Sequence, residues 1–496
     1  MSNFDVIIIG AGVSGLNTAL NLSPELSVLL ICKRSLSLSN SALAQGGIAA
    51  VTGQDPSDSA ELHIEDTLIA GGRTNNPHNL SILANSGKEA IDDIVSLGVN
   101  FDKETKGNAA DFDLALEGGH SRKRIHHHQD STGKEIVDKL IKAVLSKENI
   151  QILTNTLAAD ISKQDDGFVL TAIEGESLVR YGCSSLVIAT GGIGRVYEYT
   201  TNSAIATGDG ITLAHEIGAK IKDISLVQFH PTAFVGRHVR ECFLISEAVR
   251  GAGAYLRNAN GERFMERYDE RLELAPRDIV SHSIIEEQQR VGDKHFYLDI
   301  THKDADFVRR EFPMIYETLL HEGLDLTKDC IPIYPCQHYL MGGIQVDENS
   351  LSSIPGLYAV GECSCSGVHG NNRLASNSLL EALVFSKRCG KYITSQKAKG
   401  SGQISEAEIE QNGGKTVSSG TRTRIRSIMQ NSCFVIPNKA KATEGFAEVK
   451  EMLDDLRHGG YAITPRYVEA KSLATIAYLI LSELLAEGAS YTDCAM

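Results

Sequence analysis

Six residues near the N-terminus have the types and spacing needed to bind the phosphates of a dinucleotide. They match the pattern GxGxxG and are Gly10, Ala11, Gly12, Val13, Ser14 and Gly15. The first glycine permits a tight turn, the second lets a pyrophosphate approach the backbone, and the third lets a helix pack closely on a strand. N–H groups at the start of that helix face the phosphates. A lone match of this kind is weak evidence. Whether it marks a dinucleotide site therefore depends on the elements on either side of it.

The acidic residue that commonly binds the ribose of NAD is absent from the end of the next expected strand. Cys32, Lys33 and Arg34 stand at that position. No carboxylate is therefore available there for a ribose hydroxyl, which disfavours a standard NAD site.

The segments around the turn predict the βαβ unit that the pattern requires. Residues 4–9 form an apolar, β-branched run typical of a buried parallel strand, residues 14–22 have helical spacing, and residues 26–32 form a second strand. Two later apolar runs, 185–189 and 356–360, each end in glycine. They are expected to join the same sheet, so that the nucleotide-binding fold is discontinuous.

Length and composition favour an ordinary globular protein of two or three domains. The chain has 496 residues, 42% of them hydrophobic and 22% charged, with a net charge of −15. This acidity argues against a general nucleic-acid binder. Ten cysteines without a CxxC pair predict reduced thiols and a cytoplasmic location. Neither a signal peptide nor a membrane helix is expected, and the apolar segment 473–486 predicts a buried helix.

A second glycine-rich segment is more specific than the first. Residues 41–50, Ser-Ala-Leu-Ala-Gln-Gly-Gly-Ile-Ala-Ala, resemble the flavin-contacting loop of succinate dehydrogenase and fumarate reductase flavoproteins and of L-aspartate oxidases. Residues 206–210, 228–232 and 361–362 also resemble motifs of this superfamily. The matches run in order from residue 4 to about residue 391, which is most of the chain.

Further motifs resemble the L-aspartate oxidase branch in particular. They are Glu-Gly-Gly-His-Ser at 117–121, Leu-Ala-Pro-Arg-Asp at 274–278, Gln-His-Tyr at 337–339 with glycines at 342 and 343, and the long segment 370–379. The resemblance implies an α/β protein with a discontinuous, Rossmann-like FAD-binding domain, an inserted α+β capping domain and a C-terminal helical domain. The expected boundaries are 1–221 and 340–396 for the FAD-binding parts, 222–339 for the capping domain and 397–496 for the helical domain, which begins with a polar linker at 397–420.

The resemblance implies FAD as the cofactor. Besides the GxGxxG turn, the implied FAD contacts are Lys33, Asn40, Ser41, Ala42, Leu43, Ala44, Gln45, Gly46, Gly47, Asp209, Glu362, Ser378 and Leu379. In membrane-complex succinate dehydrogenases a histidine of the flavin loop carries the covalent flavin. Asn40 occupies that place here, so the FAD is expected to be non-covalent.

The same resemblance implies a site for a dicarboxylate that carries an amino group. Arg373, His230 and His338 are expected to bind the carboxylates, because an arginine fork can bond both oxygens and histidine can donate from one nitrogen. Arg277 is expected to act in proton transfer, and Glu117 to offset the ammonium. Ser246 and Ser376 are expected to add hydrogen bonds.

The function implied is FAD-dependent oxidation of L-aspartate to iminosuccinate, with O2 or fumarate as electron acceptor. This is the first step of NAD biosynthesis through quinolinate, which also implies coupling to a quinolinate synthase. The alternative is a soluble fumarate reductase or succinate dehydrogenase flavoprotein, from which Glu117 and Asn40 distinguish the chain. A tRNA-modifying flavoprotein and a catalytically inactive module on the same fold fit the residues less well. No metal site is expected, because the adjacent histidines 126–128 do not converge on one ion.

Overall fold

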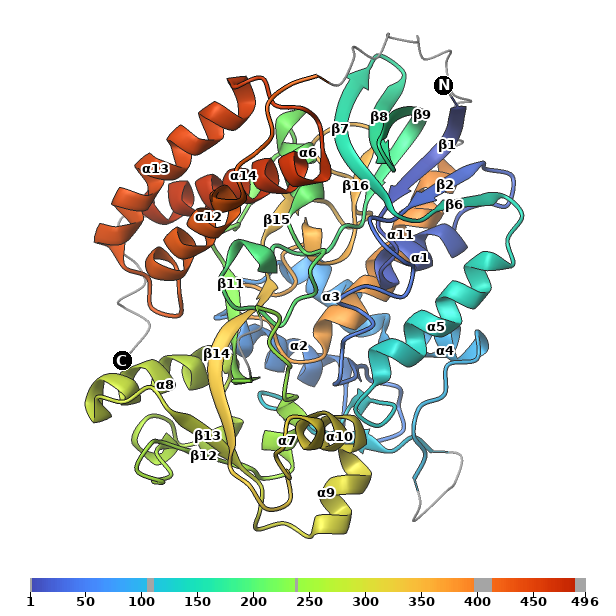
Figure 1. The fold of residues 1–496 in the computed structure, drawn as a ribbon. Helices are drawn as coiled ribbons and strands as arrows, with labels where there is room; N and C mark the ends of the chain where they lie inside the picture. The colour runs from blue at the N-terminus through green and yellow to red at the C-terminus, as the bar shows by residue number, and fades with distance from the viewer. Residues whose placement is uncertain (1, 105–110, 237–239, 397–412, 487–496) are drawn as a thin grey trace.

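A computed structural model describes residues 2–104, 111–236, 240–396 and 413–486. Its centre is a seven-stranded sheet in the order β6-β2-β1-β9-β8-β7, with β16 paired to β9 (Figure 1). The strands of this sheet are β1 (Ser2–Ile9), β2 (Val28–Ile31), β6 (Ile150–Leu153), β7 (Thr156–Gln164), β8 (Gly167–Glu174), β9 (Ser177–Ile188) and β16 (Leu357–Ala359).

The discontinuous sheet predicted from the sequence is confirmed. β1 lies between β2 and β9 and is parallel to both. β16 is also parallel to β9, with Leu357 opposite Leu186. Alternate residues of β1 face opposite layers, as the period of a strand requires. Ile7 and Ile9 pack into the cluster that includes the C-terminal helices, whereas Val6 and Ile8 pack with α1, α5 and α11.

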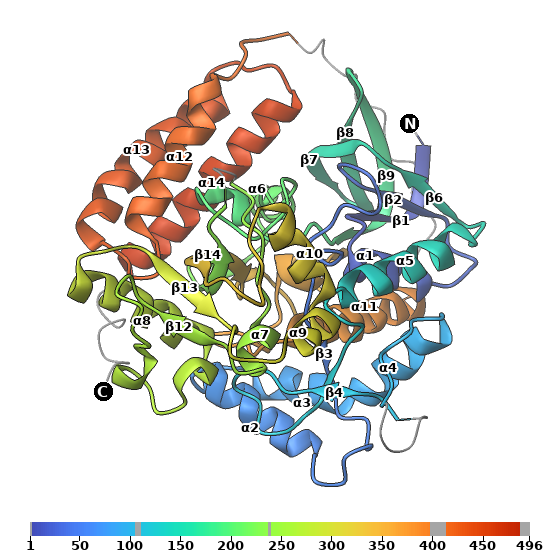
Figure 2. The ribbon, with the colours of Figure 1, turned by 60° about the horizontal axis from the view of Figure 1, so that its bottom comes forward.

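The helices around this sheet bring together segments that are far apart in the sequence. α1 and α11 lie side by side (Figures 1 and 2), and the Asn17 side chain donates to the Leu383 carbonyl at 3.0 Å. The helices of this part are α1 (Val13–Leu20), α2 (Ala60–Ala70), α3 (Pro77–Asn85), α4 (Gly87–Ser96), α5 (Thr132–Leu145), α6 (Asp209–Glu216) and α11 (Asn377–Ser395). α1 thus ends two residues before the predicted end, and Cys32 lies just outside β2.

The inserted segment has its own antiparallel sheet, in the order β11-β14-β13-β12, and its own apolar core. Its strands are β11 (Val227–Phe234), β12 (Tyr255–Arg257), β13 (Phe296–Asp299) and β14 (Ile331–Leu340), and its helices are α7 (Glu247–Gly251), α8 (Arg277–Val291), α9 (Ala305–Glu311) and α10 (Pro313–His321). The exact domain boundaries stay a prediction. The one at 221/222 divides β10 (Ile221–Lys222), and the one at 339/340 precedes the last residue of β14.

Short strands connect these parts. β10 pairs with β15 (Gly343–Gln345), which pairs with β17 (Ser364–Cys365). β3 (Ile48–Ala49) and β4 (Leu114–Ala115) both pair with β5 (Ile125–His126). The second group ties the predicted flavin loop to the segment that carries Glu117.

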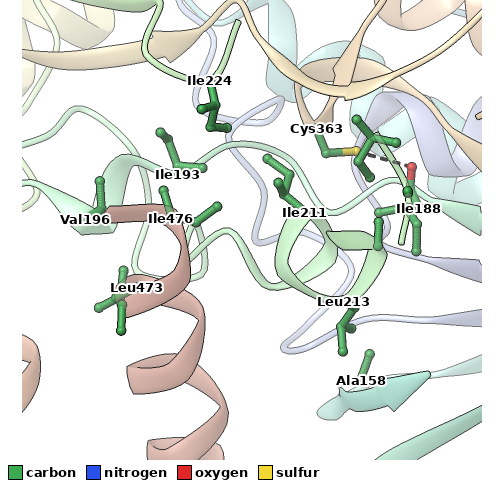
Figure 3. Close-up of a cluster of buried hydrophobic side chains, with 14 of the residues drawn as sticks. Ala158, Ile188, Ile193, Val196, Ile211, Leu213, Ile224, Cys363, Leu473 and Ile476 are labelled. Atoms are coloured by element: carbon green, nitrogen blue, oxygen red, sulfur yellow. Dashed lines mark hydrogen bonds between the residues drawn. The ribbon is translucent and has the colours of Figure 1, made fainter. Parts of the chain in front are cut away.

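Three helices form the C-terminal part: α12 (Ser419–Ser432), α13 (Lys439–His458) and α14 (Pro465–Ala486). Leu473 and Ile476 of α14 are buried beside Ile193 and Val196 (Figure 3), which confirms the predicted core helix. Most of the predicted linker, 397–412, lies outside the described residues. The prediction was wrong at its end, because residues 419 and 420 already belong to α12. No helix in the described ranges is long and apolar enough to cross a membrane.

Candidate active site

The glycine-rich turn between β1 and α1 has the close approaches that the sequence pattern predicts. Gly10 has φ +116°, and a Cβ atom there would lie 2.1 Å from the Ala189 carbonyl oxygen. A Cβ on Gly15 would lie 2.0 Å from the Gly10 carbonyl oxygen. The cap residue of α1, Gly12, has no side chain that could bond the first N–H groups of the helix. The glycines at 10 and 15 thus permit the tight turn and the close packing of the helix, and Gly12 leaves the start of α1 without a capping side chain of its own, although the Val13 N–H donates to the Ser41 hydroxyl at 3.2 Å.

A cavity of about 570 Å³ extends from this turn to the boundary with the inserted part. It is lined by the flavin loop, by the start of α11 and by residues of β11, β14 and α8. All the predicted site residues line it except Val13 and Gly15, which lie behind the turn. One continuous space thus brings together the predicted cofactor contacts and the predicted substrate contacts, and its glycine cradle fits a dinucleotide such as FAD.

Charged side chains at the cofactor end of the cavity are already paired. The Lys33 ammonium lies 3.0 Å from Asp209 Oδ2 and 2.8 Å from Glu469 Oε1 on α14. Lys33 and Asp209 both line the cavity and form an ion pair with each other. The ion pair of Lys33 with Glu469 also connects this end of the cavity to the C-terminal part. Burial raises the pKa of Glu362 to about 7, and its carboxylate accepts a hydrogen bond from the Leu340 N–H at 3.1 Å.

Two arginines converge at the other end of the cavity on one glutamine. Gln228 Oε1 accepts from Arg277 Nη1 at 3.0 Å and from Arg373 Nη2 at 3.2 Å. The Gln228 amide nitrogen is held in turn by the Arg373 carbonyl at 2.8 Å. Gln228 was part of a recognised motif but was not predicted as a site residue. Gln228 thus holds the two guanidiniums at a fixed separation. The Arg373 guanidinium also lies 4.4 Å from the centre of the Tyr339 ring.

The two predicted histidines come from neighbouring strands, β11 and β14, and their ring centres are 5.0 Å apart. His338 Nε2 lies 3.0 Å from Arg373 Nη2, and Nδ1 lies 2.7 Å from the Thr201 hydroxyl. Because arginine only donates, Nε2 accepts and the proton of the neutral ring sits on Nδ1. Burial, followed by the charge of Arg277, lowers the pKa of both histidines well below the usual range.

His230 presents a hydrogen-bond donor with nothing to bond in the described part of the chain. Its Nδ1 accepts from the Thr232 N–H at 3.3 Å, so the neutral ring carries its proton on Nε2. His230 Nε2 is buried and has no partner among the described residues, and the same holds for Arg373 Nε. A buried donor without a partner is costly. Both atoms therefore suit a ligand that brings oxygen acceptors, such as a carboxylate.

Two buried carboxylates stand among these cations. Glu117 Oε2 accepts from the Ser376 hydroxyl at 2.5 Å, and burial together with the neighbouring Glu247 raises the pKa of Glu117. Glu247 was not predicted. It lies 2.6 Å from Arg277 Nε and 3.3 Å from Arg250 Nη2, and although burial alone would raise its pKa, these two arginines hold it below the usual range. Its three-residue spacing to Arg250 was the available sequence signal.

Two other predicted site residues, Arg277 and Ser246, have contacts that fix their positions. Arg277 is buried and pairs with Glu247, so it does not form a surface ion pair. The Ser246 hydroxyl accepts from the Ala248 N–H at 3.3 Å and caps α7. The Ser246 N–H donates to Gln45 Oε1 at 3.1 Å, which ties the flavin loop to the inserted part.

The flavin loop contains an amide where covalent flavoproteins of the superfamily have histidine. Asn40 Oδ1 accepts from the Ser203 N–H at 2.9 Å. Since an amide cannot form the histidyl–flavin bond, we expect acid precipitation to release all the FAD. The measurement is the absorbance of the washed pellet and of the supernatant, and a pellet that stays yellow would contradict the expectation.

No group of three or more metal-ligating side chains with suitable geometry occurs in the ranges that the structure describes. Among the three adjacent histidines, His126 is buried against Phe101 and Phe112, and His127 lies 3.3 Å from Asp102. These contacts give the two histidines a structural role.

Residues 5–379 match the model of the FAD binding domain family. The chain is 37% identical to an L-aspartate oxidase of Yersinia pestis over 96% of this chain and 92% of the relative. It is 44% identical to an L-aspartate oxidase of Clostridium perfringens over 77% of this chain and 85% of the relative. Among solved structures, a quinol fumarate reductase chain of E. coli superposes with a TM-score of 0.88 at 29% identity, over 98% of this chain and 90% of that chain.

The likeness to fumarate reductase and the likeness to L-aspartate oxidase agree with the arrangement of the site. The fold is shared with a fumarate reductase chain at 29% identity, whereas the identity to the two L-aspartate oxidases is higher, at 37% and 44%. FAD is the cofactor of this family. The chain therefore belongs to the FAD-binding flavoproteins of the succinate dehydrogenase and fumarate reductase superfamily and, within it, to the L-aspartate oxidases.

Proposed function

We propose that this protein oxidises L-aspartate to iminosuccinate. The observation that carries the proposal is the buried carboxylate of Glu117, which lines the cavity together with Arg277, Arg373 and two neutral histidines. The second buried carboxylate at this end, that of Glu247, is already paired with Arg277 and Arg250. L-Aspartate differs from succinate and fumarate by its α-ammonium group. A site lined with guanidiniums repels a cation unless an anion offsets the repulsion. Burial and Glu247 raise the pKa of Glu117, but Ser376, Arg277 and Arg373 act in the opposite direction, and a bound ammonium would further favour the ionised carboxylate that offsets its charge.

Donors are available for the carboxylates of the substrate. Arg373 offers its unpartnered Nε together with Nη atoms that a substrate can share, and His230 offers Nε2–H. Burial, followed by the charge of Arg277, lowers the pKa of Arg373 to about 10, so the guanidinium stays charged at neutral pH. Gln228 keeps Arg277 beside this carboxylate site, and the guanidinium is proposed to act in proton transfer there. Bound FAD supplies the redox chemistry.

Arg373→Lys tests the carboxylate grip. The variant keeps the charge and loses the fork that bonds two oxygens, and it also loses the hydrogen bonds to Gln228 Oε1 and to the Ser378 hydroxyl. Charge-assisted bonds of this kind contribute about 1.5–3 kcal/mol. We therefore expect the KM for aspartate and the inhibition constant of succinate to rise together, by about 10- to 100-fold. Unchanged values for both ligands in steady-state kinetics would place Arg373 outside the site.

Molecular oxygen and fumarate are the proposed electron acceptors, giving hydrogen peroxide and succinate respectively. The product iminosuccinate is proposed to feed NAD biosynthesis through quinolinate in the cytoplasm, with a quinolinate synthase as functional partner. The alternative function is a soluble fumarate reductase, which the arginines and histidines would serve equally well. Glu117 favours the amino-acid oxidase, because a fumarate reductase has no ammonium to offset.

Steady-state turnover tests the proposed function. The purified, FAD-loaded protein is expected to form hydrogen peroxide in air with L-aspartate and not with succinate, and fumarate is expected to replace oxygen under anaerobic conditions. Fumarate reduction by a chemical electron donor without any turnover of aspartate would instead support the fumarate reductase.

A further inference from the structure

The opposite charges of the site lie on two segments that are far apart in the sequence. Glu117 begins a turn that is closed by a hydrogen bond of 3.2 Å from the His120 N–H to the Glu117 carbonyl, with Gly119 at φ +81°. Arg373 belongs to the segment that leads into α11. The separation between the carboxylate and the guanidinium therefore depends on what joins these two segments.

His120 joins them directly. Its Nε2 lies 2.9 Å from the carbonyl oxygen of Ala375, and the side chain is buried. The next residue, Ser376, has φ +61°, a left-handed conformation that is strained for a residue with a side chain and that persists only where its surroundings hold it. The Ser376 hydroxyl is the group that bonds Glu117 Oε2. His120 thus fixes the carbonyl of Ala375, and the next residue, Ser376, donates the hydrogen bond that positions Glu117.

The tautomer of His120 is fixed by a contact with Arg124. Arg124 Nη1 lies 3.2 Å from His120 Nδ1, and an arginine has no acceptor, so Nδ1 must accept. The ring proton is therefore on Nε2, where it donates to the Ala375 carbonyl. Burial and then the neighbouring His63 lower the pKa of His120 to about 3, which keeps the ring neutral. A neutral ring adds no further cation beside the site.

Arg124 is itself immobilised by two carboxylates. It is completely buried, with Nη2 2.8 Å from Asp58 and Nη1 2.5 Å from Asp66 of α2. Asp66 also accepts from the Ser121 N–H at 2.9 Å, directly beside His120. None of these groups lines the cavity. The two carboxylates hold the Arg124 guanidinium in one position, which leaves His120 with one geometry.

We propose that His120 is a positioning residue that makes the site selective for an amino dicarboxylate, by fixing Glu117 at the distance from Arg373 that a substrate ammonium requires. The proposal rests on the proposed function and assigns its substrate choice to a side chain that does not touch the substrate. A dicarboxylate without an ammonium needs Arg373 and the histidines but not Glu117. Loss of the His120 contact therefore affects aspartate more than succinate or fumarate.

A pair of substitutions separates this role from simple packing. His120→Gln keeps an N–H donor near the place of Nε2, whereas His120→Asn is too short to reach the Ala375 carbonyl. We expect His120→Asn to lower kcat/KM for aspartate about tenfold, mainly through KM, which corresponds to ~1.4 kcal/mol. Fumarate reduction and the inhibition constant of succinate should change by less than about threefold, and His120→Gln should restore most of the loss.

The ratio of aspartate oxidation to fumarate reduction, measured in one preparation, does not depend on how much of a variant binds FAD. It therefore stays readable if His120→Asn folds poorly. Equal losses of both activities in His120→Asn, or a His120→Gln variant no better than His120→Asn, would overturn the proposal. A wild-type protein that reduces fumarate but does not oxidise aspartate would overturn the proposed function and this inference with it. That result can be told apart from the failure of the inference alone, which would appear only in the His120 variants.

Discussion

Glu117→Gln should lower aspartate oxidation by about 30- to several-thousand-fold while fumarate reduction falls far less. Removing one partner of a buried charge pair costs about 2–5 kcal/mol, and each ~1.4 kcal/mol corresponds to a factor of ten. The glutamine keeps an oxygen that can accept from the Ser376 hydroxyl, so the contact that holds the side chain survives. What is lost is the negative charge that offsets the substrate ammonium beside Arg277 and Arg373.

Both activities have to be measured in one preparation, with the flavin content and the melting temperature as controls. A purely structural role for Glu117 would lower the two activities together, because Gly46 and Ser376 both pack against its carboxylate. Equal losses would therefore contradict the role of Glu117 as ammonium partner and would favour the fumarate reductase alternative.

Arg277→Leu should lower fumarate reduction by about 10²- to 10⁴-fold, the range for a positioned group that transfers a proton. The guanidinium lines the cavity beside Arg373, and Glu247 and Gln228 fix its direction. FAD binding should survive, because Arg277 lies at the end of the cavity opposite the glycine-rich turn. The measurement is fumarate reduction per bound flavin.

The substitution also leaves the buried Glu247 with one cationic neighbour, Arg250, at 3.3 Å. Loss of one partner of a buried ion pair is destabilising, so the melting temperature of Arg277→Leu should fall. Arg277→Lys is the matched control, since it retains the charge beside Glu247 and should keep the melting temperature closer to that of the wild type. Near-normal fumarate reduction in a flavin-loaded Arg277→Leu variant would exclude Arg277 as the proton-transfer group.

The local elements of the fold could be predicted from the sequence because their causes are local. The turn at Gly10 requires a residue without Cβ, and the apolar run of β1 is typical of a buried parallel strand. The predicted ends of helices were less accurate, as at α1, because the length of the last turn depends on packing and not on the periodic pattern. The left-handed backbone conformation of Ser376 could not be predicted, because serine, unlike glycine, has no preference for it.

The candidate site could be assembled from motifs, but the contacts that orient it could not. Gln228 links arginines that lie 49 and 145 residues away in the chain, and His120 bonds a carbonyl 255 residues away. Such partners depend on how separate layers pack, which no local spacing specifies. Glu247 was missed for the same reason: its partner Arg277 lies on another helix.

The most direct test of the central claim is to add L-aspartate to the FAD-loaded protein without oxygen and record the visible spectrum. The proposed function requires that aspartate bleach the visible absorbance of the oxidised flavin, because the cofactor takes up the electrons of the substrate. Succinate should perturb the band by binding to the same cations and leave the flavin oxidised. Flavin that stays oxidised with aspartate, or that is bleached equally by succinate, would contradict the assignment of this protein as an L-aspartate oxidase.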